Sequence, residues 1–186
     1  MKKLLVTALT TVLVASMVAC GGKNDVTTET TQTPEVSTET TVTTEAEEVT
    51  ADGTAGQILF AAFQEMMAAK PETTAQEAAD ALITNEIIQF MGGTMPVEQG
   101  LLSGFGNTEI KGFEEAVVFM PMIGSIPFVG YIFDMPADAD LEAFMTTLKE
   151  NADMRWQICV EAEEMVVEAI GDKVFFLMCK KDLSAE

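Results

Sequence analysis

Apolar residues recur with helical spacing in two segments between residues 54 and 90. Between residues 54 and 70 they fall three or four positions apart, which gives a helix one apolar face. These positions are Ile58, Leu59, Phe63, Met66 and Met67. Thr54 and Gln57 have the spacing of a capping box, and Pro71 stops the pattern. The sequence therefore predicts a first helix over 54–70.

A second helix is predicted over 74–90. Thr74 and Glu77 form a stronger capping box, and the Gly92-Gly93 pair stops the pattern. The inward positions of this helix are Ala78, Leu82, Ile83, Ile87 and Phe90. Both helices are thus expected to pack one apolar face on a common core.

The segment 92–113 is interpreted as one long loop, because it contains six glycines. Long loops in compact domains often have a function. Its apolar residues Leu101, Leu102 and Phe105, together with Trp156, form a candidate contact region. The alternative is a loop folded down over the core. The glycines match neither a phosphate-binding loop nor a dinucleotide-binding loop.

Residues 117–133 contain no charged side chain. A membrane span is rejected because Pro121 and Pro127 interrupt the run and no cations flank it. Two strands are predicted instead, over 116–122 and 127–134. Apolar residues on both faces of these strands indicate that the strands are central and covered.

A third helix and a hairpin complete the chain. The third helix is predicted over 139–154, where apolar residues recur with helical spacing from Leu141 onward. We interpret Asp138 and Asp140 as its N-terminal caps, because no calcium-binding loop surrounds them. Strands over 164–170 and 173–180 join at a Gly171-Asp172 turn.

The predicted fold class is α+β, in the order α-α-loop-β-β-α-β-β. The simplest arrangement is a four-stranded, mainly antiparallel sheet with the helices packed on one face. Residues 54–186 would form this single domain.

The first twenty residues have the layout of a secretory signal. Lys2 and Lys3 precede an apolar stretch too short to span a membrane, and small residues follow. The segment Met17-Val18-Ala19-Cys20 resembles the lipobox of bacterial lipoproteins, with Met17 at the position usually held by leucine. This resemblance implies cleavage after residue 19, lipidation of Cys20, and a location on the extracytoplasmic side of the cell membrane. A conventionally cleaved signal before an unmodified cysteine is the alternative.

Residues 20–53 are predicted to be a tether. The segment is rich in Thr and Glu and has no aromatic residue. Such a composition buries too little apolar area to offset the entropy of ordering, so a disordered spacer is expected. O-glycosylation of its threonines is the less favoured reading.

The net charge of the 186-residue chain is −20, and the chain contains no histidine. Removing residues 1–19, which include two lysines and no acids, leaves 167 residues at −22. This acidity argues against nucleic acid as a partner. The lack of histidine excludes Ser-His-Asp and Cys-His catalysis and histidine-ligated metals, and no cofactor is expected.

A second resemblance covers residues 114–181. The strand Val-Gly-Tyr-Ile-Phe, the Asp-started helix, Arg155-Trp156 and the closing Gly-Asp-Lys-Val-Phe-Phe hairpin are similar to uncharacterised lipoproteins of Gram-positive gut anaerobes. Those proteins have a small α+β domain after a similar tether. The resemblance implies a fold and a location, and no activity.

The favoured function is a binding or interaction module whose ligand is an envelope protein, a peptide or a wall polymer. The alternative is a carboxylate-based hydrolase of cell-wall glycan, which needs two acids across a cleft. Its candidate residues are Glu109, Glu114, Glu115, Glu161, Glu163 and Glu164.

Cys159 and Cys179 form a candidate disulfide, because exported domains can retain such bonds. The hairpin turn places Glu164, not Cys159, opposite Cys179. A bridge therefore requires residues 159–163 to curl over the strand end. Two unpaired thiols are the alternative.

Overall fold

The computed structural model describes residues 53–184. The predictions for the signal peptide, Cys20 and the tether up to residue 52 lie outside this range. The elements are α1 (Ala55–Ala69), α2 (Ala75–Ile83), β1 (Gly92–Val97), β2 (Gly100–Leu101), β3 (Glu109–Ile110), β4 (Glu115–Pro121), β5 (Val129–Asp134), α3 (Leu141–Asn151), β6 (Glu164–Ile170) and β7 (Lys173–Cys179). In residues 53–184 no helix combines the length and apolarity needed to cross a membrane.

The α+β class is confirmed, and the four-stranded sheet is wrong. Five strands form one antiparallel sheet in the order β1-β4-β5-β7-β6, while β2 and β3 form a separate short pair. The missed strand is β1, which also contains Pro96; its Gly92-Gly93 pair was interpreted as the end of the second helix and the start of a loop. Its place at the sheet edge explains the proline, because an edge strand need not donate every backbone N–H.

Close packing against α2 explains why β1 begins with glycine. A Cβ at Gly92 would overlap the Ile83 side chain of α2. Two residues on, the Thr94 hydroxyl accepts from Gln76 Nε2 at 2.9 Å and donates to Asp80. These non-local contacts attach β1 to α2, and they cannot be seen in the local sequence of the strand.

Local signals predicted the helix starts well. The Thr54–Gln57 and Thr74–Glu77 capping boxes are both present, and Asp140 caps α3 through a 3.0 Å bond from Ala143 N–H. The predicted end of the second helix was wrong, because α2 ends at Ile83 and not at Phe90.

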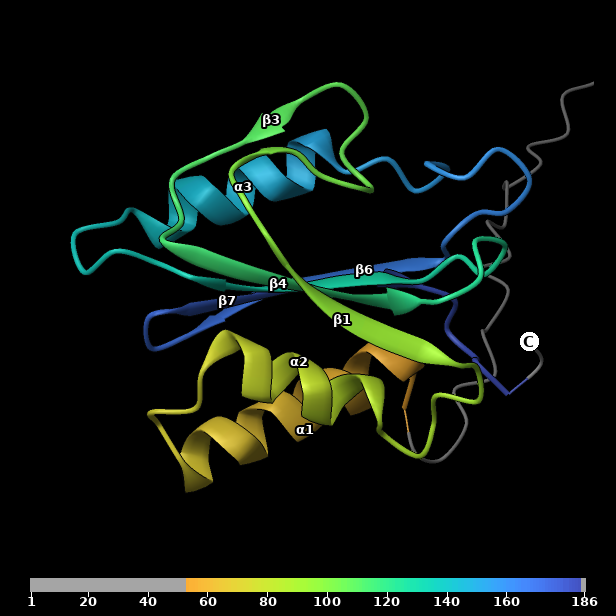
Figure 1. The fold of residues 1–186 in the computed structure, drawn as a ribbon, viewed down its shortest axis with the longest axis horizontal. Coiled ribbons are helices and arrows are strands. Elements are labelled where there is room, and N and C mark those ends of the chain that lie inside the picture. Colours follow the sequence, from red (N-terminus) through yellow and green to blue (C-terminus); the bar gives the residue numbers. More distant parts are fainter. Residues whose placement is uncertain (1–52, 185–186) are drawn as a thin grey trace, which may run out of the picture. The chain divides into compact units, whose positions relative to one another are not determined.

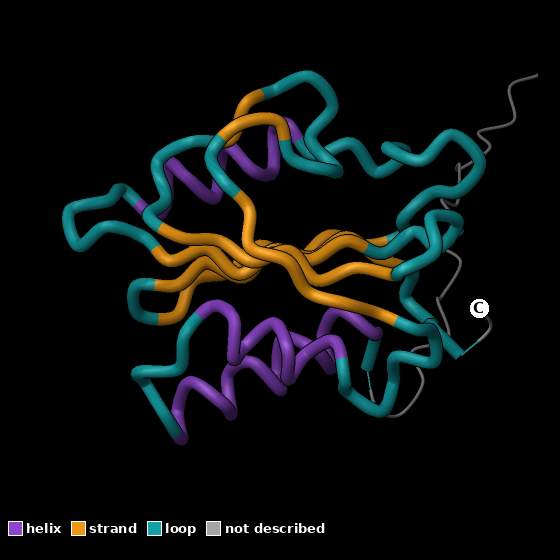
Figure 2. Tube along the Cα trace, in the orientation of Figure 1, coloured by secondary structure: helices purple, strands orange, loops and turns teal. Residues whose placement is uncertain are grey.

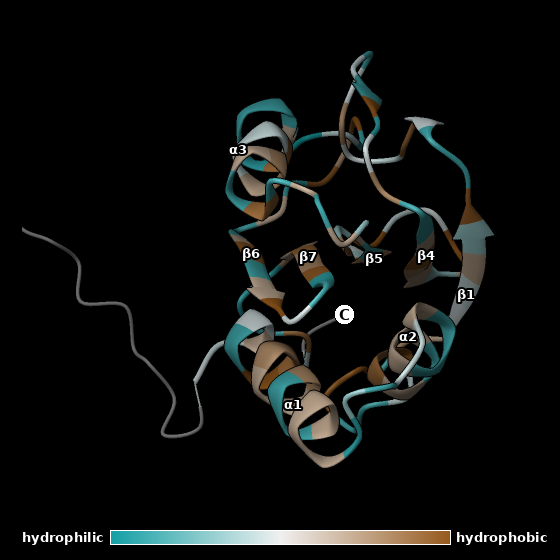
Figure 3. Cartoon of the chain, turned by 90° about the vertical axis from the view of Figure 1, so that its left-hand side faces the viewer, coloured by the Kyte–Doolittle hydropathy of each residue, from teal (hydrophilic) through white to brown (hydrophobic). Residues whose placement is uncertain are grey.

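The helices cover both faces of the sheet, which corrects the prediction that they share one face. Figure 3 shows the sheet with α3 on one side and α1 and α2 on the other, and Figures 1 and 2 show the same layers from the side. One core lies under α1 and α2 and includes Leu59, Phe63 and Phe175. The second lies under α3 and includes Phe144 and Phe176. Because β4, β5 and β7 are apolar on both faces, a one-sided helix layer would leave one face in water.

The C-terminal hairpin has the predicted register. Ile170 pairs with Lys173 and Glu164 pairs with Cys179, while Gly171 takes the left-handed conformation at φ 63°. The predicted loop 92–113 instead contains β1, β2 and β3. Its later half folds over the second core, where Tyr131 donates a 3.0 Å hydrogen bond to the Ser103 carbonyl.

Candidate functional site

The contact region expected from the sequence is mostly packed inside the domain. Leu102 and Phe105 are buried, and Trp156 is half-buried against the same core. The Phe105 ring lies 4.7 Å from that of Phe176, centroid to centroid. Leu101 is the member that stays exposed. The segment therefore acts as a cover for the second core, as the alternative interpretation held.

The candidate acids of a hydrolase lie in different parts of the domain. Strand register places Glu115 at the end of the sheet near the β6–β7 turn, whereas Glu164 lies at the opposite end. Glu109 pairs with Lys111, and Glu161 lies 3.4 Å from Arg155. The register thus separates the Glu114–Glu115 pair from the Glu161–Glu164 group by the length of the strands, so these two groups do not face each other across one cleft.

Glu164 has a structural role at the start of α1. Its carboxylate accepts from the Thr54 hydroxyl and from Gly56 N–H, both at 2.6 Å. Helix N-termini have unpaired N–H groups and a partial positive charge, so a carboxylate stabilises them. Nearby, Ala55 N–H donates to the Lys181 carbonyl at 2.8 Å. Residues from β6 and the C-terminal segment therefore cap α1.

The two cysteines of the domain are unpaired in the structure. Cys159 is exposed, and Cys179 is buried with its Sγ 3.5 Å from Glu164 Oε1. Burial, and then the adjacent Glu164 carboxylate, raise the pKa of the Cys179 thiol well above its ordinary value. Cys179 is therefore a core residue held in its neutral form, and its bridge to Cys159 stays a candidate that alkylation with and without a reductant tests.

Lys173 is a buried cation with two carboxylate partners. Its Nζ lies 2.9 Å from Asp134 and 3.3 Å from Asp172. Burial lowers the lysine pKa, but the hydrogen bonds and charge of Asp134, then of Asp172, outweigh it and raise the pKa overall. The charge is thus neutralised within the fold, at the β5–β7 pairing. In residues 53–184 no three His, Cys, Asp or Glu side chains cluster closely enough to hold a metal ion.

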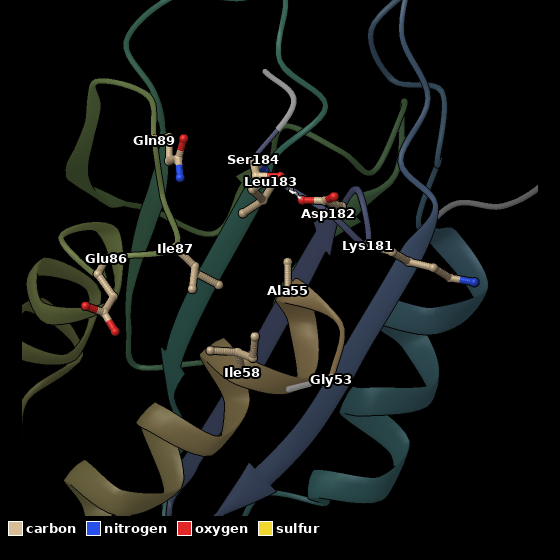
Figure 4. Close-up of a pocket in the computed structure, with 10 residues that line it drawn as sticks. All are labelled: Gly53, Ala55, Ile58, Glu86, Ile87, Gln89, Lys181, Asp182, Leu183 and Ser184. Carbon is tan, nitrogen blue, oxygen red and sulfur yellow. Dashed lines mark hydrogen bonds between the residues drawn. The ribbon is translucent and has the colours of Figure 1, made fainter. Parts of the chain in front are cut away.

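Two of the surface hollows in residues 53–184 have both polar and apolar lining residues. One, of about 470 Å³, lies between α1, the segment 86–89 and the C-terminal segment 181–184. Figure 4 shows Ala55, Ile58, Ile87 and Leu183 around it. Gly53 and Ser184 are the last described residues at each end, so this hollow borders the undescribed parts of the chain and we assign no site to it.

The other hollow, of about 610 Å³, lies beside the end of β1 and the start of β4. Its acidic lining consists of Glu98, Glu114 and Glu115. The hollow is open and has no basic lining residue. Its three carboxylates can accept hydrogen bonds, but no Lys or Arg lines the hollow to balance their charge. We do not assign a reaction to it.

Exposed apolar side chains gather where β1 pairs with β4. Six large apolar side chains of residues 53–184 are exposed, and four of them lie here. Met91 exposes 75% of its surface, Met122 68%, Met95 57% and Ile123 70%. A soluble protein rarely leaves a contiguous apolar patch unused, whereas single exposed apolar residues are ordinary.

Strand geometry places four methionines on one face of this edge. Gly93 pairs with Met120, and Met122 N–H donates to the Met91 carbonyl at 2.9 Å. Directly opposed residues share a face, as do alternate residues along a strand. Met91, Met95, Met120 and Met122 therefore share the sheet face that α3 and residues 98–113 cover elsewhere. We call these four residues the methionine face.

Gly93 lies at the centre of the methionine face. A Cβ at this position would lie 2.9 Å from Sδ of Met122, so the thioether of Met122 lies directly over the glycine. The missing side chain leaves room for the sulfur between Met91 and Met95.

Sequence reasoning missed the methionine face because it depends on β1. The spacing Met91-x-Gly93-x-Met95 and Met120-x-Met122 has the period of two that a strand face requires. That signal is informative only after residues 92–97 are recognised as a strand.

No protein-family model matches the chain, and no curated protein or solved structure is significantly similar to it.

Proposed function

We propose that this chain is a lipid-anchored extracytoplasmic protein whose domain binds a protein partner through the methionine face. The lipobox-like segment ending at Cys20 supports the anchor. The exposed methionines on the edge of an otherwise covered sheet support the binding surface, and this is the observation on which the proposal rests.

Methionine suits a binding surface because its side chain is unbranched and polarizable. It adapts to irregular apolar partners, and methionine-rich surfaces are common where one protein binds several segments. Ile123, in the turn after β4, extends the apolar surface beyond the strand end. Covering these side chains would remove apolar area from water at about 25 cal/mol per Å².

Charge restricts the chemistry of the partner. The chain has 30 acidic and 10 basic residues, so its field attracts cationic partners and repels acidic ones. An anionic lipid surface is disfavoured for the same reason. We therefore assign the face to an apolar segment of an envelope protein or peptide that is flanked by Lys or Arg.

Site-specific photo-crosslinking on intact cells tests this assignment. A benzophenone amino acid at Met122 should give a discrete protein adduct, because this residue lies at the centre of the exposed surface. The matched control is the same probe at Glu65, an exposed position on α1 on the opposite side of the sheet.

A second variant makes the test specific. Met91→Asp together with Met95→Asp should abolish the adduct from position 122, because both changes put charge on the proposed contact surface. An adduct of equal yield from position 65, an adduct with lipid alone, or no adduct at position 122 would each overturn the protein-binding proposal.

A further inference from the structure

The methionine face has four methionine side chains on one side of the β1–β4 pair, and this has a consequence beyond apolar contact. Met91 and Met122 are opposite each other across the β1–β4 pair. Met120 lies one alternate position from Met122, and Met95 lies two alternate positions from Met91, with Gly93 between them. The Met122 sulfur already lies inward over Gly93. Three of the four side chains, those of Met91, Met95 and Met122, are exposed.

We propose that the methionine face binds a soft monovalent cation, Cu(I) or its analogue Ag(I), through these thioethers. Soft sulfur ligands select Cu(I), whereas Mg²⁺ and Ca²⁺ require oxygen ligands. This ligand is separate from the protein partner proposed above, and neither proposal depends on the other.

The surroundings favour this cation over others. The chain has no histidine, so no imidazole competes for the metal. The net charge of −20 raises the local concentration of cations near the surface. Because a thioether has no proton to lose, the bound ion displaces none, and affinity should not change with pH as it does for thiolate or imidazole sites.

In residues 53–184 Cys159 is a competing soft ligand, because its thiol is exposed. The experiment therefore uses the full chain with Cys20→Ser and Cys159→Ser, so that neither thiol competes, and with ¹³C-labelled methionine methyl groups. Silver nitrate is titrated in, since Ag(I) is diamagnetic and is not oxidised in air. The methyl resonances of Met91, Met95, Met120 and Met122 should shift together and saturate at one equivalent of Ag(I).

Single Met→Leu variants separate sulfur ligation from apolar packing, because leucine keeps the apolar volume and lacks the sulfur. Met91→Leu and Met122→Leu should each weaken Ag(I) binding about tenfold or more, a loss typical of a damaged metal site. The control Met66→Leu, on α1, should leave the affinity unchanged. Between pH 5 and 8 the affinity of the chain with Cys20→Ser and Cys159→Ser should stay constant.

Shifts spread over methionines outside the face, or unchanged affinity in Met91→Leu and Met122→Leu, would overturn the metal proposal. Met91→Leu, which leaves position 122 free for the probe, should retain the photo-crosslink from position 122 to a protein partner. Failure of the metal site is thus distinguishable from failure of the binding surface.

Discussion

At the residue scale, Gly130 shows how the sheet accommodates its aromatic core. Gly130 pairs with Phe119 across β4 and β5, and the Phe119 ring lies over the glycine so closely that a Cβ there would overlap it. Both residues are buried, so the ring has little freedom to move away. The glycine is therefore required by packing, and no left-handed backbone is involved.

Gly130→Ala should accordingly lower the free energy of unfolding by about 1–3 kcal/mol, the usual effect of overpacking a core. Chemical denaturation of the variant measures this. Gly124→Ala, in an exposed turn with open space around it, is the matched control and should change stability by less than about 0.5 kcal/mol. Equal stability of both variants would contradict the packing at Phe119.

The thiols give a second prediction at this scale. In protein isolated without added oxidant, Cys159 should be alkylated quickly, because it is exposed. Cys179 should react only on unfolding, because it is buried and its pKa is raised. Intact mass after timed alkylation measures both rates. If neither thiol reacts until a reductant is added, the two cysteines are bridged and the unpaired arrangement is wrong.

At the element scale, α1 depends on Glu164 of β6. Three groups point at this carboxylate: the Thr54 hydroxyl, Gly56 N–H and the Cys179 thiol. Glu164→Gln keeps the shape, but it removes the charge and directs an NH₂ group toward one of these donors. We expect the free energy of unfolding to fall by about 1–2 kcal/mol.

The matched control is Glu168→Gln, an exposed position on the same strand. It should change stability by less than about 0.5 kcal/mol. Thermal or urea unfolding of the two variants measures the difference. Equal effects would show that the carboxylate of Glu164 does not cap α1.

Elements that depend on neighbouring residues were predictable from sequence, and elements that depend on distant ones were not. The caps at Thr54, Thr74 and Asp140 are completed within three residues, and the Gly171-Asp172 turn sets the hairpin register locally. In contrast, β1 is a strand only because α2 and β4 lie beside it. Without those neighbours, a Gly-Gly pair indicates a turn or the end of a helix or strand.

The placement of α3 could have been inferred. Residues 116–122 and 127–134 were correctly predicted to be apolar on both faces, and that pattern requires a covering layer on each side. Assigning all helices to one face left the second core uncovered. The methionine face could not be predicted before β1 was known, because its four residues come from two strands some thirty positions apart.

At the scale of the whole molecule, we propose that a lipid on Cys20 attaches the domain to the membrane. Wild-type protein should partition into the detergent phase, whereas Cys20→Ala should release it or leave an uncleaved precursor, because that cysteine is the proposed attachment point of the acyl chains. Phase separation and intact mass check this. A cleaved Cys20→Ala protein that still partitions into detergent would contradict lipidation.

The central claim is that the methionine face is covered by a ligand in the cell. Mild peroxide converts accessible methionine to its sulfoxide, and mass spectrometry reports the extent at each site. In the purified chain Met91, Met95 and Met122 should oxidise fastest among residues 53–184, because they are the most exposed methionines there. On intact cells their oxidation should slow severalfold relative to half-buried Met66 and Met154. Identical relative rates on cells and in the purified chain would contradict the claim.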